Sequence, residues 1–116
     1  MATAGCGHGG VAIEDLAEHT RARAFIERVL ERLFSANQNV VRVEDYGGVD
    51  GFDLYIFLRD WTVDEMGTVN DALADLFIPF IERFPDLDLD THVTSEHEGQ
   101  REAAIREGID ILYEAI

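Results

Sequence analysis

The chain has 116 residues, the size of a single domain, and its 47% hydrophobic content excludes wholesale disorder. No apolar run approaches the roughly 20 residues that span a bilayer, and the N-terminus lacks the pattern of a secretory signal. We therefore expect a cytoplasmic protein, with a Gly-rich flexible tail over residues 1–11 and one domain over residues 12–116. Cys6 is the only cysteine, and with His8 alone it provides too few ligands for structural zinc.

The charge is strongly negative. The net charge is −15, and all nine basic residues are arginine. Binding to nucleic acid requires cationic side chains that neutralise phosphates, so this composition disfavours a nucleic-acid partner. Two interpretations remain open: electrostatic complementarity to a basic protein partner, or a solubility device in a salt-rich cytoplasm, where self-repulsion is screened. The even spread of acids favours the second, which is typical of halophilic proteins.

The first half of the chain predicts a helix followed by a β-hairpin. Apolar residues recur at helical spacing over Ile13–Phe34. Alternation over Val40–Tyr46 predicts a strand, and residues 47–51 form a Gly-rich turn. The second strand, Phe52–Leu58, is apolar on both faces, so we expect it to be central and covered on both sides.

The second half predicts a crossover helix and a third strand. Thr62 and Glu65 form a capping box before a helix over residues 63–84, which Pro79 should kink or split. Residues 87–94 alternate as a strand. Ser95 and Glu98 form another capping box, before a helix to about Glu107 with Gly108 at its C-terminal end, and residues 109–116 are either a strand or more helix.

These elements indicate an α/β (α+β) fold with the order α-β-β-α-β-α and a final optional strand. The tight turn predicts an antiparallel pair, and the crossover helix predicts a third strand parallel to the second. We expect a small mixed sheet of three or four strands, covered by helices.

Aspartates on two of the predicted strands are the candidate functional residues. Asp53 begins the central strand, Asp50 precedes it, and Asp90 lies on the third strand. If these strands are neighbours, Asp53 and Asp90 approach each other, and paired carboxylates are the ligands that Mg²⁺ takes together with phosphate oxygens. The alternative is that they are ordinary solvated residues. His92, which shares a strand face with Asp90, is either a ligand or general base, or an exposed or hydrogen-bonded histidine.

The sequence resembles the minimal nucleotidyltransferase domain over most of the chain from residue 40. Gly47 and Gly48 correspond to the glycine pair at the end of its first strand, and Asp53 to its second metal-binding aspartate. The run LDTHVT, residues 89–94, resembles its third strand, and IREGIDILYE, residues 105–114, resembles its tail. The resemblance implies that Asp53 and Asp90 are catalytic, that they bind Mg²⁺ with Asp50, and that Gly47 and Gly48 contact a nucleotide.

The resemblance is incomplete around the metal site. Gly51 stands where the family has its first metal aspartate, and Asp50 is one residue out of register, which reverses side-chain direction in a strand. The loop after the glycine pair is short and has no arginine or lysine. A member of the family that has the fold without the catalytic activity is therefore one of the alternatives.

Three functional hypotheses follow. The first is a nucleotidyltransferase-like domain, active or degenerate, that binds Mg-nucleotide or acts in a toxin–antitoxin type of complex. The second is a non-enzymatic acidic module that binds a protein partner, as an antitoxin or adaptor, through the Trp61 region or residues 109–116. The third is a structural homodimer.

Overall fold

The computed structural model describes residues 13–48, 50–96 and 107–115. The elements are α1 (Ile13–Phe34), β2 (Val40–Asp45), β3 (Gly51–Leu58), α2 (Val63–Arg83), β4 (Asp88–Ser95) and β5 (Asp110–Glu114). The fold is therefore α+β with the order α-β-β-α-β-β, and the predicted bounds of the first helix and the first three strands hold to within about one residue. The expected tail over residues 1–11 and the helix after the Ser95 capping box lie outside the described residues.

The four strands form one mixed sheet in the order β4-β3-β2-β5. β2 pairs antiparallel with β3, and β3 pairs parallel with β4, as the tight turn and the crossover helix predict. The final apolar segment is a strand, which pairs antiparallel with β2. Gly108 precedes this strand with a φ of +76°, a conformation that glycine adopts without steric cost.

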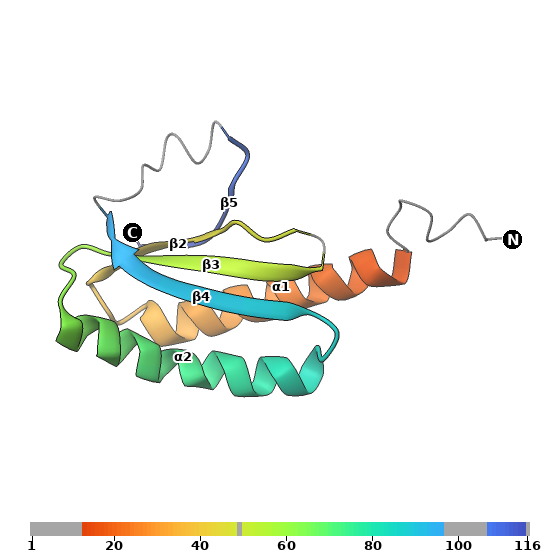
Figure 1. Cartoon of the computed structure of the whole chain (residues 1–116), viewed down its shortest axis with the longest axis horizontal. Helices are drawn as coiled ribbons and strands as arrows, with labels where there is room; N and C mark the ends of the chain where they lie inside the picture. Colours follow the sequence, from red (N-terminus) through yellow and green to blue (C-terminus); the bar gives the residue numbers. More distant parts are fainter. Residues whose placement is uncertain (1–12, 49, 97–106, 116) are drawn as a thin grey trace, which may run out of the picture.

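Both described helices cover the same face of the sheet (Figure 1). Leu54 and Ile56 of β3 point into the core on that face, where they join buried residues of α1 and α2. On the opposite face Asp53 and Tyr55 remain partly exposed, while Phe57 is buried. The expectation that β3 is covered on both sides therefore holds only in part, because the described helices cover one of its two faces.

The crossover helix is continuous. Thr62 is its N-cap, and its Oγ1 accepts a hydrogen bond from the Glu65 amide at 3.0 Å. Pro79 lies inside the helix and does not split it, so that alternative is wrong. A proline removes one backbone hydrogen bond, but Leu76 and Phe80 on either side are fully buried and hold this turn against the core. No helix in the described part of the chain is long and apolar enough to cross a membrane.

Candidate functional site

The two candidate aspartates lie side by side. Asp53 of β3 and Asp90 of β4 are register partners in the parallel pair, so their side chains leave the same face of the sheet. This is the face opposite the helices. The neighbourhood that the sequence predicted for these two residues is therefore confirmed, and their metal-binding and catalytic roles stay predictions.

Asp53 has a histidine as its partner. Nε2 of His92 lies 2.8 Å from Oδ1 of Asp53, within hydrogen-bond distance. The imidazole also stacks on the ring of Tyr55, with centroids 4.5 Å apart and planes at 22°. The hydrogen-bonded alternative for His92 is thus what the structure has. The contact links the neighbouring strands β3 and β4.

The carboxylates do not gather into a metal centre. No group of three or more His, Cys, Asp or Glu side chains that could hold a metal ion occurs among residues 13–48, 50–96 and 107–115. Asp50 lies in the turn before β3 and does not join Asp53 and Asp90 in such a group. A magnesium ion on this face would have at most the Asp53 and Asp90 carboxylates from that predicted set.

The glycine turn is held by a carboxylate from the preceding strand. Oδ1 of Asp45 accepts hydrogen bonds from the amides of Gly47 at 2.8 Å and Asp53 at 3.1 Å. The carbonyl of Gly48 is 3.1 Å from Nε2 of His19. Phosphate binding by this turn would use backbone amides, but the Gly47 amide is already bonded to an anionic group that repels phosphate. The local geometry therefore favours a structural turn.

Position 51 has no space for a side chain. A Cβ atom added to Gly51 would lie 2.9 Å from both Cβ and the carbonyl oxygen of Asp88, its partner on β4. Ordinary van der Waals contacts begin at 3.4 Å. This is the position at which the resemblance places the first metal aspartate. An aspartate at this position would therefore require β3 and β4 to move apart.

A polar network that is buried at Arg42 and Glu44 lies beside the site, and it was not predicted from the sequence. Nε of Arg42 donates to Oε2 of Glu44, and the Tyr46 hydroxyl donates to Oε1 at 2.6 Å. Glu44 is fully buried, and the Arg42 guanidinium lies over the Phe57 ring, 4.3 Å from its centroid. The available signal was the spacing of Arg42, Glu44 and Tyr46, because alternate residues of a strand share one face.

The Tyr46 phenol loses its proton with unusual difficulty. Its hydrogen bond to Glu44 is the largest cause, followed by burial and by the negative charges of Glu44 and Glu107. Together they raise the pKa of Tyr46 from 10.0 to about 12, against the opposing charge of Arg42. Tyr46 therefore acts as a hydrogen-bond donor at neutral pH and not as a base.

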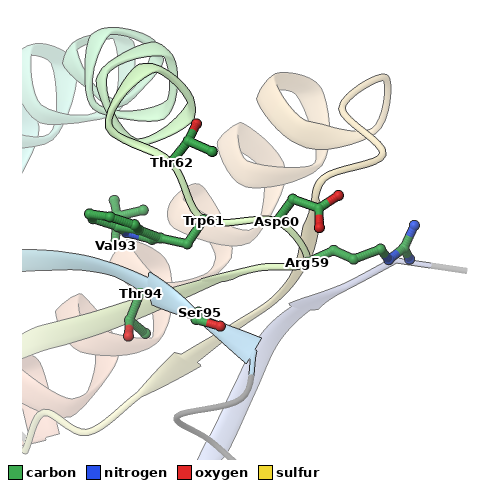
Figure 2. Close-up of a pocket in the computed structure, with 7 residues that line it drawn as sticks. All are labelled: Arg59, Asp60, Trp61, Thr62, Val93, Thr94 and Ser95. Atoms are coloured by element: carbon green, nitrogen blue, oxygen red, sulfur yellow. The ribbon is translucent and has the colours of Figure 1, made fainter.

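A separate open pocket of about 670 Å³ lies where β4 ends and α2 begins (Figure 2). It is lined by Arg59, Asp60, Trp61, Thr62, Val93, Thr94 and Ser95. Trp61 is 42% exposed, so much of its indole is available for contact. The pocket contains none of the candidate aspartates, and it belongs to a different part of the surface.

Sequence comparison with family models and curated proteins gives no match. The functional argument therefore rests on the geometry of the site.

Proposed function

We propose that this chain is a nucleotidyltransferase-like domain without a working catalytic centre, and that it acts as a protein-binding module. The observation that carries the proposal is the lack of space at Gly51, where the first metal aspartate would have to stand. The bonded amide of Gly47 adds to it, because it removes a phosphate contact. The order of helix, hairpin, crossover helix and parallel strand is consistent with the resemblance.

The surface offered to a partner is acidic. Asp50, Asp53, Asp88 and Asp90 lie at the end of the β3–β4 pair where both strands begin, and we call this surface the carboxylate face. Among the described residues, no arginine lies within ion-pair distance of these four carboxylates, and the one basic side chain in contact with them is His92, at Asp53. A basic segment of another protein would find complementary charge here. This partner class is also what the toxin–antitoxin hypothesis requires.

The test compares two variants of equal charge. The chain is used as bait in a native extract at low and at high salt. Asp53→Asn/Asp90→Asn should lose the partner that the wild type retains. Asp64→Asn/Asp71→Asn, which removes two exposed carboxylates from α2, should retain it. Equal capture by both variants would refute a role for the carboxylate face.

The register pairing of Asp53 with Asp90 favours a second candidate, the binding of Mg-nucleotide without catalysis. Two adjacent carboxylates suit a Mg²⁺ ion that keeps waters and takes phosphate oxygens. Isothermal titration with Mg²⁺ alone and with Mg-ATP tests this directly. Heat that disappears in Asp53→Asn would support the candidate, and no heat with the wild type would eliminate it.

A further inference from the structure

The strand β4 forms a long and regular edge of the sheet. It has eight residues, and its pairing with β3 runs without a register shift from Asp88 to Ser95. Its other side has no partner among the strands that the structure describes. The segment has no proline, no lysine and no bulge, which are devices that normally block strand addition at an edge. The opposite edge strand, β5, is shorter and its pairing with β2 is shifted.

An uncharged stripe runs along α2 beside this edge. It consists of Val63, Gly67, Asn70, Ala74, Ile78 and Ile81, which recur at intervals of three and four residues and so share one helix face. Val63, Ile78 and Ile81 are 69%, 63% and 61% exposed. In a chain of which 28% of the residues are charged, an exposed stripe without any charge requires an explanation.

The stripe points away from the other helix. The guanidinium of Arg83 lies over the Phe25 ring of α1, 5.1 Å from its centroid, so this flank of α2 faces α1. At about 100° per residue, Ile81 projects roughly 160° away from Arg83. The stripe therefore lies on the flank of α2 where β4 ends the sheet, and Figure 1 shows α2 below β4 with α1 behind it.

We propose that a second copy of this chain docks on this surface, with β4 paired antiparallel to the partner's β4 and the α2 stripe packed on the partner's stripe. Two chains that each carry a charge of −15 repel each other, so they can associate only where few like charges meet, and the α2 stripe carries no charge. A basic partner would instead be attracted to the acidic surfaces. The dimer would have one continuous sheet with its helices on one side. This proposal does not depend on the proposed function.

Charge also selects the register of the strand pair. Opposite residues in an antiparallel pair point to the same face, so a two-fold axis must pass between two copies of the same residue. An axis at Thr91 places Asp90 opposite the partner's His92 and Leu89 opposite the partner's Val93. Each Asp90 carboxylate then meets an imidazole that can donate a hydrogen bond on one face, and apolar side chains meet on the other.

The neighbouring registers are less favourable. An axis at His92 would place Asp88 opposite the partner's Glu96, and an axis at Asp90 would place two aspartates opposite each other. Like charges directly across a strand pair destabilise it. The Thr91 register also places the partner's Leu89 opposite Val93, a residue that lines the pocket beside Trp61 (Figure 2).

The oligomeric state and the register can both be measured. Light scattering at low and high salt should give about twice the 13.0 kDa mass of one chain. In a Cys6→Ser background, Thr91→Cys should form an intermolecular disulfide on mild oxidation, because its Cα lies about 4.5–5.5 Å from its equivalent. Val93→Cys is the matched control, since its equivalents would be about 13 Å apart.

A charge placed on the stripe should separate the copies. Ile78→Glu/Ile81→Glu should raise the dissociation constant at least about tenfold, because like charges then face each other. Leu16→Glu, at a 47% exposed position of α1, should leave the dimer intact. A monomer at both salt concentrations, equal cross-linking of both cysteine variants, or a dimer unaffected by the stripe charges would each overturn the proposal.

Discussion

Placing an aspartate at position 51, where the resemblance has its first metal aspartate, is the sharpest test of the proposed lack of a catalytic centre. Gly51 lies opposite Asp88, and any Cβ at position 51 would come 0.5 Å inside the 3.4 Å limit of ordinary contact. Two of the atoms it meets are the Cβ and the carbonyl oxygen of a neighbouring strand, which cannot rotate out of the way. Gly51→Ala and Gly51→Asp should therefore both force the two strands apart.

The expected cost follows from the size of this overlap. Overpacking of a well-packed site costs about 1–3 kcal/mol. For a domain of this size each kcal/mol lowers the melting temperature by roughly 3–6 °C. We therefore expect both variants to melt several degrees below the wild type, by up to roughly 18 °C, with Gly51→Asp the less stable because it also adds a charge beside Asp88.

Thermal unfolding by circular dichroism measures this effect, with and without Mg²⁺. Gly48→Ala is the control, because its added Cβ would meet only Oδ1 of Asp50, at an ordinary 3.6 Å. This control should stay within about 0.5 kcal/mol of the wild type. A Gly51→Asp variant as stable as the wild type, or one that Mg²⁺ stabilises, would refute the steric argument against a metal centre.

Three further predictions concern other contacts. Thr62→Ala should lower the free energy of unfolding in urea by about 0.5–2 kcal/mol, because the Glu65 amide loses its acceptor. Thr62→Ser keeps a hydroxyl acceptor and should retain most of this free energy. Equal losses of stability in the two variants would contradict the role of Thr62 as N-cap. Glu44→Ala should cost about 3–5 kcal/mol, because it leaves Arg42 buried without its counter-charge. Arg42→Met/Glu44→Leu should cost much less, and a double variant as unstable as the single one would argue against this explanation. Because the pKa of Tyr46 is raised, its contribution to the free energy of unfolding is complete below pH 10 and is lost as the pH rises to about 12. Tyr46→Phe should remove this part of the loss of stability at high pH. An unchanged dependence of stability on pH would contradict the contact with Glu44.

Most of the elements could be predicted from the sequence because their signals are local. The periodicity over Ile13–Phe34 and the cap at Thr62 involve residues within one or two helical turns. The short Gly-rich turn predicts the hairpin, and the crossover helix predicts the parallel strand. Even the pairing of Asp53 with Asp90 could be anticipated, since it needed only that these two strands be neighbours.

The working details of the site depend on contacts between residues that are distant along the chain or that belong to different elements. The Asp45 carboxylate accepts a hydrogen bond from the Asp53 amide, and His92 reaches Asp53 from another strand. The lack of space at position 51 depends on how closely β3 and β4 approach. No local pattern encodes these distances, because they result from packing across the sheet.

For the acidic residues, too, the sequence determines one part of the argument and the tertiary structure the other. Net charge and the absence of lysine are properties of the sequence, and they disfavour nucleic-acid binding without any structure. Which carboxylates matter is a question of position, and the strand register brings Asp53 and Asp90 together on one face. The charge-free flank of α2 becomes a surface only because β4 ends the sheet beside it, and this depends on the strand order, which tertiary pairing alone decides.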